Sequence, residues 1–297
     1  MFETFNYFRQ YNENQEIQDY KSFYREFSNS REFGGNFTNY DHLVKNRFCD
    51  NFQVVYNAVL RKMPEKVLDV GCGNGVNLPI AKMLPVEYHG LDYAEKTIET
   101  ARKNYPSVHF HVGDAFNMQF EDASFDMVIL SSVLILYKDQ KDQLKLIREC
   151  LRVLKPSGVL VLVVWNAAPI LYVSIKISRI MGRLFNEKLP MDFNGMHFSK
   201  SEIARLISEV DCKVSESVLT SSGYGVLESV RYLNFAKYRR KFGIAESEAF
   251  IHPQSIYEDL SKQAGRFRFL TFLFYRISKV MPSAFSFFSV NLIEKTK

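Results

Sequence analysis

The segment Val67–Gly75, which reads VLDVGCGNG, constrains the fold of this chain more than any other stretch of its sequence. A short apolar run of strand type passes directly into Gly71, Gly73 and Gly75, and a segment of helical character follows. Glycine tolerates positive φ and lacks a Cβ, so the backbone can pass close to a ligand with its N–H groups facing it. The segment therefore predicts a strand, a nucleotide-binding turn and a helix.

The spacing of these glycines separates two classes of nucleotide site. Here it is G-x-G-x-G, whereas the dinucleotide fingerprint is G-x-G-x-x-G. Val76 stands where the third dinucleotide glycine would fall. A nicotinamide-dependent oxidoreductase is therefore disfavoured, although the turn alone leaves it open.

Residues 66–165 alternate between apolar runs and helical segments, which predicts parallel β-α-β units. Two of the runs are apolar on both alternating faces, as in strands covered by helices on both sides. The fold class expected is α/β, with a doubly wound, mostly parallel sheet of seven strands. The strands are expected at 66–70, 86–91, 108–112, 125–130 and 159–165, and the helices at about 75–84, 94–104 and 139–154.

The rest of the chain is expected to flank this core. Residues 1–60 are predicted to form an N-terminal helical cap, 61–165 the cofactor-binding core, and 166–297 the remainder of the sheet. That remainder would carry helical lid insertions at about 168–198 and 220–285. Its predicted elements are a capped helix at Ser199–Val210, opened by a Ser-x-x-Glu box, and strands at Lys213–Val218 and Ser289–Ile293.

Composition narrows the class of protein. The 297 residues carry a net charge of +5, with 24% charged residues, which is mildly basic rather than typical of a dedicated nucleic-acid binder. The four cysteines show no zinc or disulfide spacing and fit a reducing cytoplasm. The N-terminus has no secretory pattern, and no apolar run is long enough to span a bilayer.

Residues just after the predicted strands form a coherent set, because ligands of open parallel sheets bind beyond the carboxyl ends of the strands. Asp92 ends the second strand, where it could accept from both ribose hydroxyls. Asp114 follows the third strand and could accept from an adenine amino group, while Tyr93 or Phe116 could cover the ring. Together with the glycine turn, these residues predict a nucleoside site.

At this point the sequence resembles the class I S-adenosylmethionine-dependent methyltransferases. Five segments within residues 66–165 carry the resemblance, in the order typical of that family. They are VLDVGCGNG at 67–75, GLDY at 90–93, GDA at 113–115, SFDMV at 124–128 and LRVLKPSG at 151–158. The turn at Lys155–Gly158 is expected to lead into the next strand.

The resemblance implies S-adenosylmethionine as cofactor and a role for each matching residue. The glycine turn would hold the methionine part, Asp92 the ribose, and Asp114 with Ala115 the adenine. Asp69 would orient either the turn or the ligand's ammonium group. The region of Ser131 would close over the methionine tail.

The reaction implied is an in-line displacement in which an O, N, S or C atom of the acceptor attacks the methyl group. Alignment in a water-poor site can supply much of the rate, so a pair of acid and base groups is not required. The candidate bases are His197, just before the capped helix, and Tyr137, after the fourth strand.

Three other reactive side chains are interpreted as packing residues. Cys72 lies within the turn and is expected to pack as a small apolar residue rather than act as a nucleophile. His109 and His111 share one face of the third strand, which would permit metal binding. Because no acidic residue lies near them in sequence, packing is preferred and no metal is expected.

The high content of aromatic residues, 14%, favours a small, partly apolar acceptor. Residues 170–185 predict a basic amphipathic helix and 266–280 a similar segment, which we interpret as lid elements. The alternative is peripheral contact with a membrane and a lipid or quinone acceptor. The basic run at 237–241 matches no RNA-binding module, so nucleic acid is not expected as a partner. A non-catalytic nucleoside-binding module is the alternative from another class.

Overall fold

The computed structural model describes residues 49–73, 77–78, 80–81, 84–170, 173, 196–220, 277, 280–286 and 288–295. Residues 1–48 of the predicted cap lie outside this set, as do Gly75, Val76 and, in all, half of the residues of the predicted helix at 75–84. The greater part of both predicted lid segments also lies outside it, since only 168–170, 173 and 196–198 of the first and 220, 277 and 280–285 of the second are described. The basic segment at 237–241 lies wholly outside, and those at 170–185 and 266–280 lie outside except for residues 170, 173, 277 and 280.

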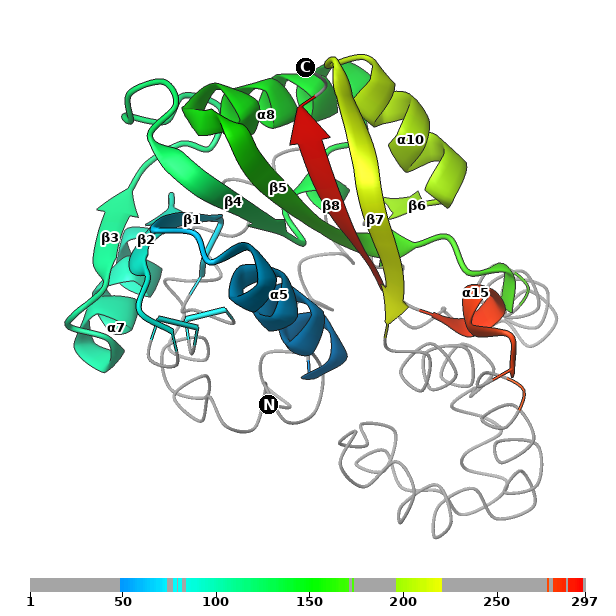
Figure 1. Ribbon diagram of the computed structural model, residues 1–297, viewed down its shortest axis with the longest axis horizontal. Coiled ribbons are helices and arrows are strands. Elements are labelled where there is room, and N and C mark those ends of the chain that lie inside the picture. The colour runs from blue at the N-terminus through cyan, green and yellow to red at the C-terminus, as the bar shows by residue number, and fades with distance from the viewer. Residues whose placement is uncertain are drawn as a thin grey trace, which may run out of the picture.

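The core of the protein is a mixed sheet in the order β3-β2-β1-β4-β5-β8-β7, with the short strand β6 beside the end of β5 (Figure 1). Strands β1 to β6 pair with one another in parallel, whereas β8 runs antiparallel between β5 and β7. The predicted doubly wound α/β sheet is confirmed, and β6 is an addition to it. The strands are β1 (Lys66–Val70), β2 (Glu87–Asp92), β3 (His109–Val112), β4 (Phe125–Ser131), β5 (Leu154–Asn166), β6 (His197–Phe198), β7 (Cys212–Thr220) and β8 (Phe288–Lys295).

Helices cover both faces of the sheet (Figure 1). Two buried clusters show this, because α8 and α10 contribute to one and α5 and α7 to the other. Adjacent residues of β4 alternate between the clusters, Val128 in the first and Met127 in the second, as expected for a strand buried on both sides. The helices are α5 (Cys49–Lys62), α7 (Glu95–Asn104), the 3-10 turn η1 (Leu134–Leu136), α8 (Gln140–Val153), α10 (Lys200–Ser208) and α15 (Pro282–Phe285).

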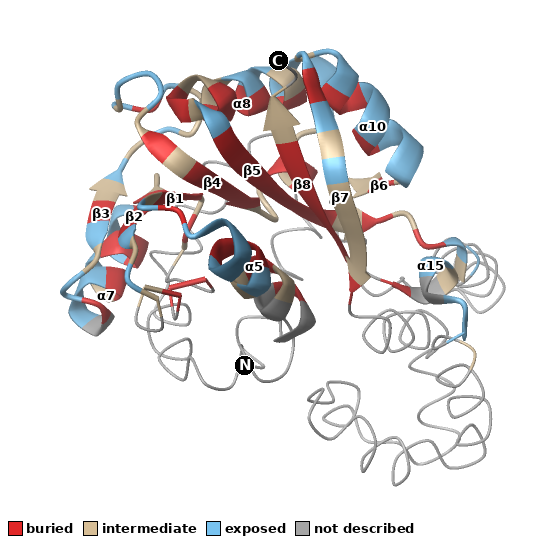
Figure 2. Ribbon diagram, in the orientation of Figure 1, coloured by how far each residue is buried: buried red, intermediate tan, exposed pale blue. Residues whose placement is uncertain are grey.

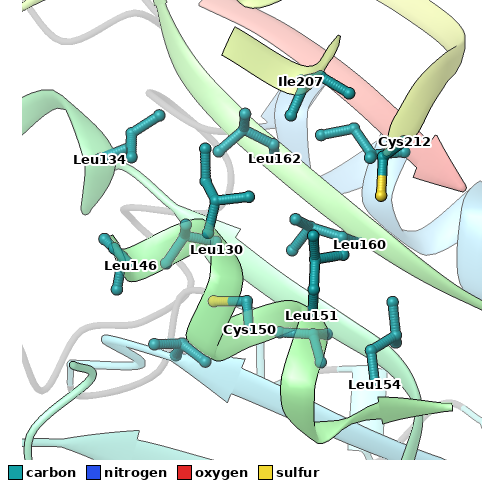
Figure 3. Packing of buried hydrophobic residues seen from close by; sticks show 14 of the residues in the cluster. Leu130, Leu134, Leu146, Cys150, Leu151, Leu154, Leu160, Leu162, Ile207 and Cys212 are labelled. Atoms are coloured by element: carbon teal, nitrogen blue, oxygen red, sulfur yellow. The ribbon is translucent and has the colours of Figure 1, made fainter. Parts of the chain in front are cut away.

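The most deeply buried part of the sheet lies in its middle strands, β4 and β5 (Figure 2). On one face, leucines of these strands meet Leu146, Cys150 and Leu151 of α8 (Figure 3). Ile207 of α10 closes the same cluster. Each fully buried aliphatic side chain contributes roughly 1.5–3 kcal/mol relative to an exposed one, so these helices dock mainly through apolar burial.

Helix α10 begins as the sequence predicts. The Ser199 hydroxyl accepts from the backbone N–H of Glu202, and the Glu202 carboxylate accepts in return from the backbone N–H of Ser199. These reciprocal bonds satisfy donors that the first turn of a helix leaves unpaired. The start of the helix is therefore encoded locally, although it ends at Ser208 rather than at Val210.

The predicted turn at Lys155–Gly158 is wrong, because these residues belong to β5, which begins at Leu154. Phe125 pairs with Leu154 and Met127 with Val159, so residues 155–158 together face Asp126 across an irregular stretch of the ladder. A Cβ at position 158 would lie 2.8 Å from the carbonyl oxygen of Asp126, which explains the glycine there.

None of the helices within the described ranges combines the length and apolar character that crossing a bilayer requires.

Candidate functional site

The order of the strands marks where a ligand would bind. Strand β1 lies between β2 and β4, so the chain leaves it toward one edge of the sheet and later returns to its other side. Ligands of open α/β sheets bind beyond the carboxyl ends of the strands at such a switch point. Two segments meet there, the glycine turn after β1 and the Ser131–Val133 segment after β4. A Cβ at Gly71 would clash with Cγ2 of Val133, so the two segments are in close contact.

Backbone geometry at the turn agrees with the role predicted for its glycines. Gly71 and Gly73 have φ angles of +69° and +56°, which residues with a Cβ rarely adopt. The N–H groups of Gly71 and Cys72 donate to the carbonyl oxygen of Leu91, at 2.7 and 3.0 Å. The turn is therefore held against the end of β2.

Asp92 is the polar centre of this arrangement. One carboxylate oxygen accepts from the N–H of Gly73 and the other from the N–H of Ala94, each at 2.9 Å. Its carbonyl oxygen accepts from the N–H of Gly113, after β3, at 3.0 Å. A carboxylate has about four acceptor sites, so both oxygens can still accept from a ligand's hydroxyl groups. Burial raises the pKa of Asp92, and the two backbone N–H donors oppose that shift.

Asp69 lies deeper than Asp92 and is only 1% exposed. The Tyr88 hydroxyl donates to its carboxylate at 3.0 Å, and the Asn77 amide, beyond the glycine turn, lies 3.4 Å away. Burial raises the pKa of Asp69 to about 7, against the effect of these two donors. Of the two roles predicted for Asp69, orienting the turn is the one that its contacts support.

The loop after β3 brings together the residues predicted to bind adenine. The exposed Asp114 accepts from the backbone N–H of Phe116 at 3.0 Å, which fixes the direction of the loop. Ala115 and Phe116 are half-buried, and the Phe116 ring meets the Tyr137 ring edge-on at 4.9 Å between centroids. Tyr137, a candidate base, therefore lies against the predicted adenine side. Tyr93 is half-buried beside Asp92.

An anchor for this loop was not predicted from the sequence. The Arg152 guanidinium donates to the carbonyl oxygens of Met118 and Phe120, at 2.9 and 2.8 Å. Glu149 accepts from the backbone N–H of Met118 at 2.7 Å and also pairs with Arg152. Arg152 lies in one of the segments that resemble the family, but the sequence does not show which loop it contacts.

A second residue that the sequence analysis passed over is Ser132, next to the predicted Ser131. Ser131 ends β4 and is half-buried, whereas Ser132 has a φ of +58°. The buried Ser132 hydroxyl finds no hydrogen-bond partner within the described part of the chain. Backbone strain and an unpaired buried hydroxyl each cost free energy and tend to persist at functional sites.

His197, the other candidate base, lies on the same edge of the sheet. It begins β6, where it pairs with Trp165 at the carboxyl end of β5, and the two rings are 5.3 Å apart. The neighbouring Met196 donates its N–H to the carbonyl oxygen of Ile135 in η1, at 2.7 Å. The segments that carry His197 and Tyr137 are thus in contact, although they are far apart in sequence.

The remaining reactive side chains lie elsewhere or are inert. Cys72 is buried, and burial together with the charges of Asp92 and Asp69 raises the pKa of its thiol, which confirms the packing role. His109 and His111 lie on β3 opposite His89 and Leu91 of β2, and His89 contacts both Glu87 and His111.

The residues present fit S-adenosylmethionine. The Asp92 carboxylate at the end of β2 suits a ribose, and the Asp114 carboxylate and the Phe116 ring after β3 suit an adenine. A Cβ at Gly73 would meet no atom of the described residues within 4 Å, so among these residues the turn leaves open space where the methionine part is expected. The buried Ser132 hydroxyl, which has no hydrogen-bond partner among the described residues, is available to bond a polar group of the methionine part.

Comparison with known proteins points the same way. The sequence model of the family described as "Methyltransferase domain" matches residues 68–162. The chain is 38% identical over 113 residues to a demethylmenaquinone methyltransferase of Thermotoga maritima, covering 36% of this chain and 47% of that protein. It is 26% identical over 186 residues to a probable S-adenosylmethionine-dependent methyltransferase of Mycolicibacterium smegmatis, covering 62% and 66%. The chain thus spans between about half and two thirds of these relatives.

Among solved structures, the fold is similar to that of a magnesium protoporphyrin IX methyltransferase from Synechocystis with bound SAH, S-adenosylhomocysteine. The TM-score is 0.52 at 19% identity, with 68% of this chain and 93% of that chain covered. Sheet order, glycine turn and family match agree over the same residues. Residues 68–162 are therefore similar to the S-adenosylmethionine-dependent methyltransferases, and the sheet has a Rossmann-like α/β fold.

Proposed function

We propose that this protein transfers the methyl group of S-adenosylmethionine to a small, partly apolar acceptor. The observation that carries the proposal is the position of Asp92, whose carboxylate is bonded to the N–H of Gly73 at the switch point of the sheet. This places a ribose acceptor beside a turn that leaves room for the methionine part. Methyl transfer is the chemistry for which this domain family uses that cofactor.

In this proposal the protein acts mainly by alignment. The sulfonium methyl group supplies the electrophile, and an acceptor atom must approach it in line with the bond that breaks. Asp92 and the glycine turn hold the nucleoside and methionine parts, while Phe116 and Ala115 exclude water from the adenine. Holding two reactants in such geometry is worth several kcal/mol of the barrier, on the order of 7–11 for well-aligned cases.

Either His197 or Tyr137 would take a proton from the acceptor. Contact between Met196 and Ile135 supports a shared location for their segments. We expect His197→Gln or Tyr137→Phe to lower kcat by about 10²–10⁴ if the residue is the base. Binding of S-adenosylhomocysteine should stay unchanged, and steady-state kinetics with calorimetry measure both. A fall in cofactor affinity with kcat unchanged would instead assign the residue to the adenine side.

One alternative for the acceptor is a quinone or another membrane lipid. The similarity to a demethylmenaquinone methyltransferase favours it. A short-chain demethylnaphthoquinone and a set of polar amines and phenols should be offered to the full chain with S-adenosylmethionine. Release of S-adenosylhomocysteine with the quinone alone would favour the lipid variant. Binding to anionic liposomes at low salt would support peripheral membrane contact.

The cofactor itself is tested by calorimetric titration with S-adenosylhomocysteine. Asp92→Ala should abolish detectable binding, and Asp92→Asn should weaken it, because an amide keeps only one acceptor oxygen. Asp142→Ala is the matched control, since Asp142 is an exposed acid on α8 to which no role in cofactor binding is assigned. Circular dichroism and thermal unfolding establish that each variant is folded. Wild-type protein that is folded but silent in this titration would refute the proposal.

Two other classes of function make different predictions. A nicotinamide-dependent oxidoreductase would bind NADH, which a fluorescence titration detects. A non-catalytic nucleoside-binding module would bind S-adenosylmethionine tightly but turn over no acceptor from a broad extract. We also propose a cytoplasmic location, supported by the free thiols of Cys72, Cys150 and Cys212, the cysteines whose side chains the structure describes.

A further inference from the structure

A cluster of metal-ligating side chains lies at the opposite end of β2 from Asp92. Glu87 and His89 lie on one face of β2, two residues apart, and His109 and His111 share the corresponding face of β3. In the register of this parallel pair, His89 lies opposite His109 and Leu91 opposite His111. Neighbouring strands therefore supply the acidic partner that the sequence around His109 lacks.

The ligand atoms of this cluster are close enough to share one ion. One atom from each of Glu87, His89 and His109 lies within 4.8 Å of the others, and His89 Nε2 is 2.7 Å from Glu87 Oε1. Ligands of a tetrahedral zinc ion, bonded at about 2.0–2.1 Å, lie about 3.4 Å apart. Glu87 and His109 are exposed at the surface, so small side-chain rotations can close the difference.

His111 completes the cluster by orienting His89. Its Nε2 lies 3.0 Å from Nδ1 of His89, so a neutral His89 that offers Nε2 to a cation can donate its Nδ1–H to His111. Metal-bound histidines usually donate their second ring N–H in this way. The His89 ring is also packed edge-on against Phe125 and Phe120, at 5.4 and 6.3 Å between centroids, which fixes its position.

We infer that Glu87, His89 and His109 form a binding site for a zinc-like divalent cation, with His111 as the residue that positions His89. Two imidazoles and one carboxylate with an open fourth position are a ligand set that zinc accepts.

The site would be structural rather than catalytic. His89 precedes Asp92 by about 10 Å along the strand, at roughly 3.3 Å per residue, and lies toward the amino end of β2. Strand β3 is the edge of the sheet and is only four residues long. A cation bridging β2 and β3 would fasten this short edge strand to its neighbour.

One residue competes for the same carboxylate. Lys66 Nζ lies 3.1 Å from Oε1 of Glu87, the oxygen that also contacts His89. A bound cation must share Glu87 with this ammonium group or displace it. Replacing Lys66 by methionine removes the competing charge but keeps an unbranched side chain only one atom shorter, so Lys66→Met should bind the cation more tightly than the wild type.

The test uses the full chain without a histidine tag, stripped with a chelator and titrated with Zn²⁺ by calorimetry. We expect one ion per chain to bind at Glu87, His89 and His109. His109→Asn and Glu87→Gln should each lower the affinity for Zn²⁺ by more than about 100-fold, which exceeds the loss typical of residues that only position a ligand. His111→Asn should lower it by about 10–100-fold. Glu99→Gln, an exposed carboxylate on α7, is the matched control and should leave it unchanged.

Two further measurements sharpen the result. Co²⁺ should give visible absorption bands of a tetrahedral site in the wild type and lose them in His109→Asn. Zn²⁺ should raise the melting temperature of the wild type but not of that variant. The inference is overturned if the wild type fails to bind Zn²⁺ at micromolar concentration, or if His109→Asn and Glu87→Gln bind it as the wild type does. Titration with S-adenosylhomocysteine, with and without Zn²⁺, tests the cofactor site independently of the metal site. Cofactor binding that is the same in both conditions would leave the proposed methyl transfer standing whatever the outcome for Zn²⁺.

Discussion

The two ends of strand β2 hold polar groups in different ways. At the carboxyl end, Asp92 accepts from backbone N–H groups of the glycine turn and of α7. At the amino end, Glu87 and His89 bond to each other and to neighbouring side chains. Backbone donors move only with the fold, whereas the exposed side chain of Glu87 can rotate to a new partner at little cost. The first end is therefore built into the domain, and the second is open to adjustment.

If that contrast holds, changes around the switch point should cost much more stability than changes in the histidine cluster. The largest effect is expected at Asp69, beside the turn. Its pKa is about 7 in the folded protein and near 3.8 when unfolded, so the folded state holds the proton between those values. The stability that the folded state gains by holding this proton is fully present below pH 3.8 and is lost as the pH rises to about 7. About three pH units at 1.36 kcal/mol each give a loss of about 4 kcal/mol.

Urea unfolding between pH 4 and pH 8 measures this effect. The free energy of unfolding of the wild type should fall across that range relative to that of Asp69→Asn, which cannot ionise. Asp142→Asn, an exposed acid on α8, serves as the control and should follow the wild type. Parallel curves for the wild type and Asp69→Asn would show that Asp69 is ionised in the folded protein at low pH, contrary to its burial.

The next effect compares two glycines of the same turn. Gly71→Ala should cost about 3 kcal/mol, because a Cβ there is strained at positive φ and clashes with Val133. Gly73→Ala has similar strain, but its Cβ would meet none of the residues that the structure describes within 4 Å, so it should cost only about 1 kcal/mol. Its effect should instead appear in calorimetry as weaker binding of S-adenosylhomocysteine. Equal stability of the two variants would mean that the Val133 segment moves away freely.

The smallest effect is expected at the other end of β2. Without added metal, Glu87→Gln should change the free energy of unfolding by less than about 1 kcal/mol, since surface ion pairs such as that with Lys66 contribute little. Denaturant titration in the presence of a chelator measures it. A loss comparable to that of Gly71→Ala would remove the contrast between the two regions.

Patterns within one strand or one turn carried most of the successful predictions. Apolar runs located β1 to β5 within a few residues, and the glycines at 71 and 73 do adopt positive φ. The acids at the strand ends lie at the predicted edge of the sheet, because parallel strands bring their carboxyl ends together.

Features that depend on partners from other segments were missed. The strand character of residues 155–158 arises from their position opposite Asp126 on β4, which the local Pro-Ser-Gly sequence does not show. The grouping of His109 with Glu87 depends on the register between β2 and β3. Likewise, the role of Arg152 depends on which loop lies beside the end of α8. Such contacts are set by packing, so local sequence patterns do not report them.

The position of β8 has a consequence for how this domain is made. Strand β7 pairs with β8 and not with β5, although it precedes β8 in sequence. On the side that faces β8, Val163 of β5 pairs with Val290, so this half of the sheet needs contacts across more than a hundred residues of chain. Contacts of such long range slow folding, because the intervening chain must be closed first. During synthesis, strands β1 to β5 can therefore pair before β8 has been made. Strand β7 can join the sheet only after β8 has left the ribosome.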